Sequence, residues 1–214
     1  MLKRGALVRI LVSGNQTWLG ESIARRLAAA HDVVALGTMP DGSVRTIAGD
    51  ARDRDVATTA TEGCDAVIQI ADSAGIGATS VEALDLATRG SVSLITTGKS
   101  LSRFILLSSL RLFERYPTHY WINEQWSPRP TTDPVDPGQP APVRFGAFPF
   151  SVSWEDAADA MRLALRAPEF PHPFEVFHIL GDLPHDKYSN EKAKRLLHWQ
   201  PRDALESHWT RPSH

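Results

Sequence analysis

The 214-residue sequence predicts an α/β fold, a doubly wound parallel sheet with helices on both faces. Short apolar runs alternate along the chain with segments whose apolar residues recur at helical spacing. One run, residues 64–72, is almost continuously apolar, which is typical of a strand buried on both faces of a parallel sheet. Because strands and helices alternate in this way, we expect right-handed crossovers between parallel strands.

The first predicted unit is a strand that begins at Val8, a turn that contains glycine, and a helix over residues 19–27. The turn has the pattern Gly14-x-x-Thr17-x-x-Gly20. Such a turn points backbone N–H groups and the N-terminus of a helix at a pyrophosphate, and glycines avoid collisions there. Thr17 carries a side chain at the middle position, so we expect it to weaken binding of such a ligand by ~1–3 kcal/mol.

The other elements follow from the same two patterns. Further strands are expected at residues 32–36, 46–48, 64–72, 103–109 and 175–181. Further helices are expected at residues 52–62, 79–99 and 154–167. Ser153 is a suitable N-cap for the third of these helices, and Pro168 follows its end. Six prolines among residues 127–142 exclude a helix from that segment.

Composition narrows the possible classes of protein. The net charge of -2 is spread along the chain, so we expect neither nucleic acid nor a membrane surface as a partner. No apolar run approaches the ~18 residues of a membrane span, and the N-terminus has no signal-peptide pattern. Cys64 is the only cysteine, which favours a reducing, cytoplasmic location and a buried structural thiol.

Four segments together resemble a known family. They are residues 14–20, 49–53, 64–71 and 103–109. Their order and separation are similar to those of the extended short-chain dehydrogenase/reductase superfamily, in particular its NAD-dependent epimerase/dehydratase branch. The resemblance implies a single Rossmann-like domain, with a nucleotide-binding half (1–112), a proline-rich irregular segment (113–147) and a reduced C-terminal part (148–214).

The resemblance also implies a cofactor, NAD or NADP, and a set of residues that would contact it. The turn would face the pyrophosphate, two residues after the third strand would meet the adenine, and the end of the fourth strand would line the path of the cofactor. These residues are Gly14, Asn15, Gln16, Thr17, Trp18, Leu19, Gly20, Asp50, Ala51, Ile70, Ala71 and Asp72. Ser109 would be the surviving catalytic residue.

Simpler interpretations of some of these residues stay open. Asp50 could instead cap the helix that starts near Arg52, and Ser109 could be a hydroxyl satisfied by the backbone at a strand end. Gly37 stands where an acid for the ribose is usual. Asp41 or Arg45 could replace that acid, or both could be solvated loop charges.

The catalytic pair of the family has no counterpart at its expected place. Family members have a Tyr-x-x-x-Lys helix about 25 residues beyond the serine, where this chain has its proline-rich segment. The tyrosine, acidified by the nearby ammonium, exchanges a proton as hydride moves. Tyr188 and Lys192 match the spacing, but they lie in the segment that resembles the C-terminal helix of the family, so we reject them as the catalytic pair.

Other residues give little further indication of chemistry. No histidine pair has metal-ligand spacing, so no metal is expected, and His172 and His178 are interpreted as structural. Trp121, Trp126 and Trp154 could line an aromatic pocket or could cover exposed core.

Three functions remain open. The chain could be an NAD(P)-dependent epimerase, dehydratase or dehydrogenase of a small, sugar-like substrate, with impaired catalysis and a homodimeric state. It could be an inactive binding or regulatory protein. It could also be a cofactor-independent enzyme that uses Ser109, Asp72, His119 or Glu124 as acid or base, in which case the loop from 116 to 126 is the place to look.

Overall fold

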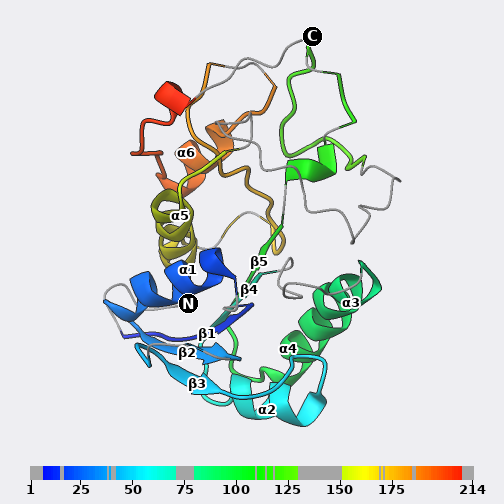
Figure 1. Cartoon of the computed structure of the whole chain (residues 1–214), viewed down its shortest axis with the longest axis vertical. Helices are drawn as coiled ribbons and strands as arrows, with labels where there is room; N and C mark the ends of the chain where they lie inside the picture. The colour runs from blue at the N-terminus through cyan, green and yellow to red at the C-terminus, as the bar shows by residue number, and fades with distance from the viewer. Residues whose placement is uncertain are drawn as a thin grey trace. The chain divides into compact units, whose positions relative to one another are not determined.

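The computed structural model of the chain contains two compact units (Figure 1). The first comprises Met1–Ser108 and Ala164–Arg166, and the second comprises Ser109–Leu163 and Ala167–His214. The structure describes residues 7–14, 17–37, 39, 42–70, 80–108, 110–113, 115–117, 119–129, 151–168, 170, 172–184 and 187–208.

The first unit is built on a five-stranded parallel sheet. Its strands are β1 (Arg9–Ser13), β2 (Asp32–Leu36), β3 (Arg45–Ile47), β4 (Ala66–Ile70) and β5 (Arg103–Leu107). The strand order is β3-β2-β1-β4-β5. The chain therefore builds the sheet outwards from β1 in one direction and then returns to build it in the other. This reversal, between β1 and β4, is the place where open α/β sheets bind ligands. The parallel sheet confirms the predicted α/β fold.

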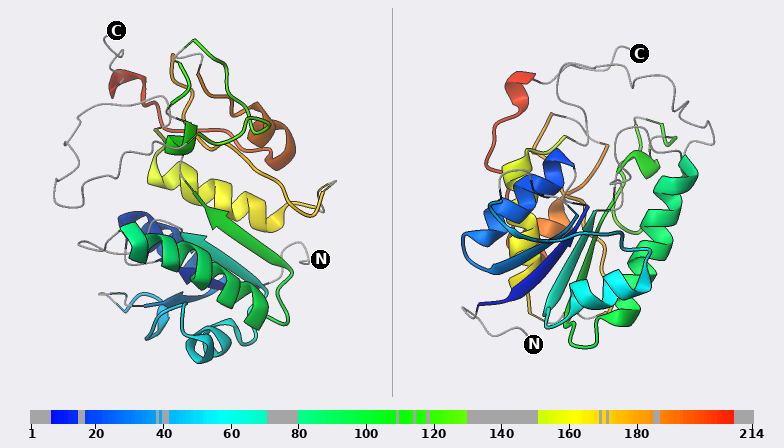
Figure 2. Two further views of the ribbon diagram at one scale, coloured as in Figure 1. Left: turned by 90° about the vertical axis from the view of Figure 1, so that its right-hand side faces the viewer. Right: turned by 60° about the horizontal axis from the view of Figure 1, so that its bottom comes forward.

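Helices cover both faces of this sheet (Figure 2). They are α1 (Trp18–Ala28), α2 (Arg54–Thr61), α3 (Ser80–Asp85) and α4 (Ser91–Thr97), with a π-helical turn, η1 (Leu86–Gly90), between α3 and α4. On the face covered by α2 and α4, the apolar core includes Leu11, Val67 and Leu94. Cys64 is buried in the same core, as expected of a structural thiol.

The helix expected over residues 79–99 differs from the prediction in two respects. The π turn interrupts it, and its apolar residues divide between two faces. Leu94 is buried, whereas Val81, Leu84 and Val92 are exposed. The buried face instead follows Leu86, Gly90 and Leu94, because the wider turn changes which residues meet the core.

The second unit contains short helices and irregular segments. The helices are the 3-10 turn η2 (Leu110–Phe113), α5 (Trp154–Arg166), α6 (Glu191–Leu197) and the 3-10 turn η3 (Glu206–His208), although the last three residues of α5 belong to the first unit. Ser153 caps α5, since its side chain accepts a hydrogen bond from the Asp156 N–H at 3.0 Å. This N-cap and the end of the helix before Pro168 are as predicted.

One expected strand is missing from the second unit. Residues 175–181 have no ladder partner among the described residues, although their sequence has a strand-like apolar content. The segment is held by separate bonds: the Gly181 N–H donates to the Ser151 carbonyl at 2.8 Å, and the His178 N–H donates to Glu124 Oε1 at 3.1 Å. A strand requires a neighbouring strand, and this segment meets loops instead.

Residues 199–203 are tied to α5 by the carboxylate and carbonyl of one residue. The side chain of Asp156 accepts hydrogen bonds from the backbone N–H groups of Arg202 at 3.0 Å and Asp203 at 3.1 Å. Its carbonyl accepts from Trp199 Nε1 at 3.0 Å. Just before Trp199, His198 ends α6 in the left-handed conformation, with φ of 54°.

Candidate functional site

The predicted cofactor residues of the first unit follow the carboxyl ends of its strands. Gly14 follows β1, Gly37 follows β2, Asp50 lies three residues beyond β3, and Ile70 ends β4. Because all five strands are parallel, these ends share one edge of the sheet. The fold thus brings together residues that are far apart in the sequence.

Backbone conformation fixes the turn after β1. Gly14 has φ of 89°, a conformation that residues with a Cβ atom rarely adopt. A similar constraint applies before Asp50, where Gly49 has φ of 136° and an added Cβ atom would lie 2.7 Å from Val56 Cγ1. Both positions therefore require glycine.

Thr17 has a structural role in this turn that the glycine pattern did not indicate. It is the N-cap of α1: its Oγ1 accepts from the Gly20 N–H at 3.0 Å and donates to the Gly14 carbonyl at 3.1 Å. The hydroxyl is thus bonded to both glycines of the motif. A threonine directly before a helical pattern is itself an N-cap signal, which could have identified this role.

Asp50 is held by Arg52 rather than by a helix. The Arg52 N–H donates to Asp50 Oδ1 at 2.8 Å, Arg52 Nε lies 3.0 Å from each carboxylate oxygen, and Nη2 lies 2.5 Å from Oδ2. These hydrogen bonds lower the pKa of Asp50. The alternative in which Asp50 caps the next helix is wrong, because α2 starts at Arg54 and its cap is Asp53, which accepts from the Asp55 N–H at 2.9 Å.

The structure describes some of the predicted site residues and not others. Ala51 and Ile70 are buried, with 2% and 3% exposure, and Leu19 is half-buried at the start of α1. The predictions for the remaining residues lie outside the described part of the chain. These are Asn15, Gln16, Asp41, Ala71, Asp72, Ser109 and the side chain of Trp18.

One buried polar side chain at this edge escaped the sequence analysis. Gln69 lies on β4 directly before Ile70, and its register partners are Ser13 on β1 and Leu106 on β5. It is fully buried, and within the described residues neither its Oε1 nor its Nε2 has a hydrogen-bond partner. A lone glutamine inside an apolar strand was the signal for it, since buried amides are normally bonded.

Comparison with known proteins agrees with this geometry. The model of the NAD dependent epimerase/dehydratase family matches residues 10–137, more than half of the sequence. The chain belongs to the NAD-dependent epimerase/dehydratase family. No curated protein gives a significant match to the sequence.

Solved structures share the fold at low sequence identity. A uronate dehydrogenase from Agrobacterium tumefaciens has a TM-score of 0.70 and 19% identity, covering 92% of this chain and 85% of its own. A glucuronic acid dehydrogenase from Chromohalobacter salexigens has a TM-score of 0.71 and 20% identity, covering 94% and 87%. The Bordetella bronchiseptica enzyme WbmG, solved in complex with NAD, has a TM-score of 0.69 and 15% identity, covering 97% and 93%. These likenesses confirm the Rossmann-like α/β fold.

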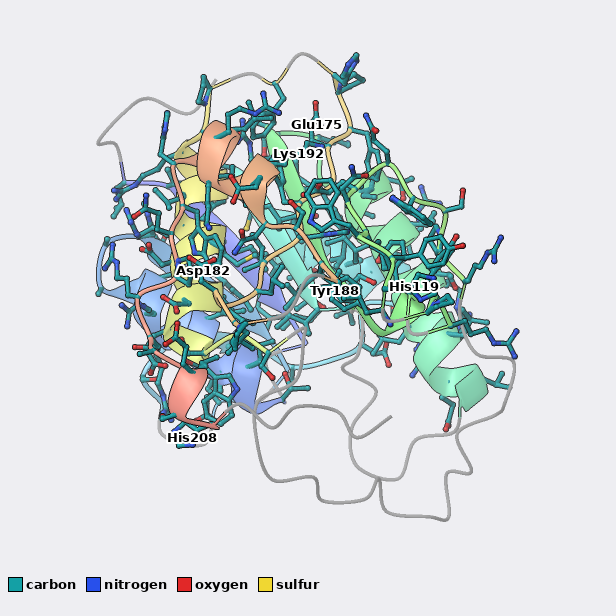
Figure 3. The ribbon with its side chains drawn as sticks, turned by 90° about the horizontal axis from the view of Figure 1, so that it is seen from above. His119, Glu175, Asp182, Tyr188, Lys192 and His208 are labelled. Atoms are coloured by element: carbon teal, nitrogen blue, oxygen red, sulfur yellow. The ribbon has the colours of Figure 1, made fainter. Side chains whose placement is uncertain are left out.

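The one Tyr-x-x-x-Lys match in this family member lies in the second unit (Figure 3). Tyr188 is buried and bridges Ile122. Lys192 pairs with Glu175, Nζ to Oε2 at 2.7 Å, and lies 5.1 Å from the centre of the Phe177 ring. Its ammonium is therefore already paired with a carboxylate.

The aromatic loop, residues 116–126, places its two tryptophans in different surroundings. Trp126 packs against the apolar core of the second unit, and its ring centre lies 4.9 Å from that of Tyr116. Trp121 is 54% exposed and lines a hollow of about 190 Å³. Trp154, at the start of α5, is exposed.

Polar side chains line the rest of this hollow. Asp182 Oδ1 accepts from Asn190 Nδ2 and Lys194 Nζ, each at 2.9 Å. Burial raises the pKa of Asp182, but these two bonds outweigh it and the net pKa is lowered. The hollow thus combines an exposed indole with a carboxylate, an amide and an ammonium.

The proposed acids and bases of the second unit have different surroundings. His119 is exposed, with its ring centre 4.8 Å from that of Tyr120. Glu124 accepts the backbone bond from His178. His178 is buried, and burial lowers the pKa of its imidazole. Within the described part of the chain no hydrogen bond reaches either of its ring nitrogens, so its environment is that of a core residue.

Proposed function

We propose that this protein binds a nicotinamide dinucleotide at the carboxyl edge of the sheet in its first unit, and that the family's proton-coupled hydride transfer is impaired. The observation that carries the proposal is the turn between Gly14 and Gly20. Its threonine is bonded back to both glycines, so the side chain that departs from the family pattern supports the turn.

The residues at this edge fit such a ligand. Gly14 has a conformation suited to close approach of a pyrophosphate, and the N-terminus of α1 adds a favourable dipole. Asp50 offers an ionised carboxylate, 42% exposed, to an adenine amino group. Gln69, next to Ile70, carries a buried amide that has no hydrogen-bond partner among the described residues. When bound, the dinucleotide would supply a hydride donor or acceptor.

The proposal of impaired catalysis rests on the missing proton donor. The chain has three tyrosines, and only Tyr188 has a lysine four residues later. That lysine pairs with Glu175, and the hydroxyl of Tyr116 donates to the Ser127 carbonyl at 2.9 Å. With these groups engaged elsewhere, we expect proton transfer to depend on Ser109 or on water, at a rate lower by about 10²-fold or more.

Two finer proposals concern partners. The hollow beside Trp121 and Asp182 suits a small, hydroxylated molecule, because its wall has an aromatic face and several hydrogen-bonding groups. Exposed apolar side chains of α3 and α4 favour a homodimer. They are Val81, Leu84, Val92 and Ile95.

Calorimetry with NAD+, NADH, NADP+ and NADPH tests the proposal directly. We expect micromolar binding of at least one of them to the wild-type protein and a loss of tenfold or more in Gly14→Val, because valine is strained at this φ. Gly42→Ala is the matched control: Gly42 also has a positive φ, 63°, but an added Cβ atom meets nothing within 4 Å. The affinity of the Gly42→Ala variant for the dinucleotide should match that of the wild-type protein.

The opposite outcome has a definite meaning. If no dinucleotide binds at millimolar concentration, the proposal fails, and the family fold would then serve a binding or regulatory role without this cofactor. If binding occurs but Gly14→Val leaves it unchanged, the dinucleotide does not use the turn after β1.

A further inference from the structure

Arg52 lies between two carboxylates in the first unit. On one side it makes the contacts with Asp50 described above, through its backbone N–H, Nε and Nη2. On the other side its Nη1 lies 3.3 Å from Asp85 Oδ2. The two carboxylates are 35 residues apart in the sequence, so the guanidinium joins the loop after β3 to the end of α3.

The far end of this arrangement is also fixed. Asp85 Oδ2 accepts a hydrogen bond from Arg89 Nη2 at 2.7 Å, one helical turn further along. The Arg52 side chain is only 29% exposed, and its hydrogen bonds to Asp50 raise its pKa. Arg52 therefore has little freedom to leave Asp50, and its planar guanidinium fixes the orientation of the carboxylate.

The bonds from Arg52 define what Asp50 can still accept. An ionised carboxylate has about four acceptor positions. Arg52 offers it three N–H groups, one of which, the Nε–H, is shared between the two oxygens, and because the carboxylate remains 42% exposed a further donor can reach it from the open side. Because the same bonds lower the pKa of Asp50, it stays an acceptor and does not become a donor at neutral pH.

We propose that Arg52 determines which base the dinucleotide site accepts, by holding Asp50 as a fixed acceptor that selects a base with an exocyclic amino group. This rests on the proposed binding of a dinucleotide. Adenine carries such an amino group and can donate to Asp50. Hypoxanthine carries a carbonyl oxygen at the same position, which would face the carboxylate and leave it without a donor. Arg52 acts through Asp50 and is a positioning residue.

The test compares two ligands that differ only in this group. Dissociation constants of NAD+ and nicotinamide hypoxanthine dinucleotide, or of their 2′-phosphates if the wild-type protein prefers NADP+, are measured by calorimetry. We expect the wild-type protein to prefer the adenine form by about tenfold or more. In Arg52→Gln the carboxylate can rotate, and the preference should fall below about threefold.

A nearby arginine supplies the control. Arg54, the first residue of α2, is exposed, and Arg54→Gln makes the same chemical change two residues away. It should leave the ratio of the two constants as in wild type. Because the ratio is taken on one preparation, a fraction of misfolded protein lowers the number of sites and does not alter it.

Two milder variants keep the inference testable if Arg52→Gln fails to fold. Arg52→Lys keeps the charge but loses the planar guanidinium, and Asp85→Asn loosens Arg52 without touching Asp50. Both should give an intermediate preference. An unchanged ratio in the variants that bind overturns the inference and leaves the proposed function standing. Absence of dinucleotide binding to the wild-type protein overturns both.

Discussion

Each of the two units is stabilised internally by a different kind of interaction. In the first, five parallel strands form continuous backbone ladders, as between β1 and its neighbours β2 and β4. In the second, the described residues form one isolated bridge, between Ile122 and Tyr188. There, side chains such as Asp156 and Asn190 accept or donate the bonds that join separate segments. A regular sheet distributes its hydrogen bonds over many residues, whereas the second unit concentrates them on a few.

The difference suggests where each unit is most sensitive to mutation. Loss of a single polar side chain should matter little in the first unit, where the backbone supplies most of the bonds. The same loss should lower the free energy of unfolding much more in the second unit.

Five of the six tryptophans belong to the second unit and only Trp18 belongs to the first, so tryptophan fluorescence mainly reports the second unit.

The largest effect is expected from the apolar core of the first unit. Leu94 on α4 is fully buried, and Leu94→Ala should lower the free energy of unfolding by about 4 kcal/mol through lost burial and the cavity left behind. Urea unfolding followed by far-UV circular dichroism measures this. Thr96→Ala, on the exposed face of the same helix and outside the proposed dimer patch, should change the free energy by less than about 0.5 kcal/mol. Equal losses in both variants would contradict the assigned faces of α4.

The next effect tests the polar anchors of the second unit. Asp156→Ala leaves the backbone N–H groups of Arg202 and Asp203 without their acceptor, which should cost about 3 kcal/mol. Its neighbour Glu155 is an exposed acid in the same turn of α5, and Glu155→Ala should cost only about 0.5 kcal/mol. Urea unfolding followed by tryptophan fluorescence would separate the two. A loss below about 1 kcal/mol in Asp156→Ala would show that the anchors are dispensable.

A pH effect of smaller size is expected from His178. Burial lowers the pKa of its imidazole below the ordinary value of 6.5, outweighing the opposite effects of Glu124 and of the Ser189 backbone, while the charge of Lys192 acts in the same direction as burial. The unfolded chain therefore binds a proton more readily than the folded protein. Stability should be complete above pH 6.5 and should decrease as the pH falls below it.

The variant His178→Phe isolates this contribution. The difference in the free energy of unfolding between wild type and variant should be constant at neutral pH. It should shift in favour of the variant as the pH falls below about 6.5. A difference that does not change with pH would mean that His178 titrates normally in the folded protein.

The smallest effect is a gain in stability at the end of α6. His198 has a left-handed conformation that costs a residue with a Cβ atom about 1 kcal/mol. His198→Gly should therefore stabilise the protein by about 0.5–1 kcal/mol, measured as a raised urea midpoint. Gln200→Gly, two residues later, lacks this strain and should not stabilise it. Destabilisation by His198→Gly would indicate that a contact of the imidazole stabilises the protein by more than the backbone strain costs.

The sequence predicts the first unit better than the second, for a physical reason. Strand β2 has the predicted bounds. A strand of a parallel sheet is buried on both faces, so its length can be seen in the sequence as a continuous apolar run. The strand expected at residues 175–181 was wrong, because apolar content does not show whether a partner strand exists. The interruption of the helix over 79–99 depends on how η1 packs, and the spacing of apolar residues in the sequence does not show this packing.

The site shows the same division between local and distant determinants. The glycines after β1 could be recognised from a local pattern, and the N-cap role of Thr17 was available from the same stretch. The contact of Arg52 with Asp85 was not, because only folding brings these two residues together. The roles of Ser109, Asp72 and the other residues outside the described part of the chain stay predictions.

The buried thiol of Cys64 provides an internal reporter for the first unit. It is the only cysteine, lies under α2 with its Sγ donating to the Ala60 carbonyl at 3.3 Å, and has a pKa raised to about 11 by burial. Alkylating reagents attack the thiolate, so they should reach it only when this unit opens. Labelling kinetics would then follow the opening of the sheet core, and fluorescence would follow the second unit. Both measurements use the wild-type protein without any substitution.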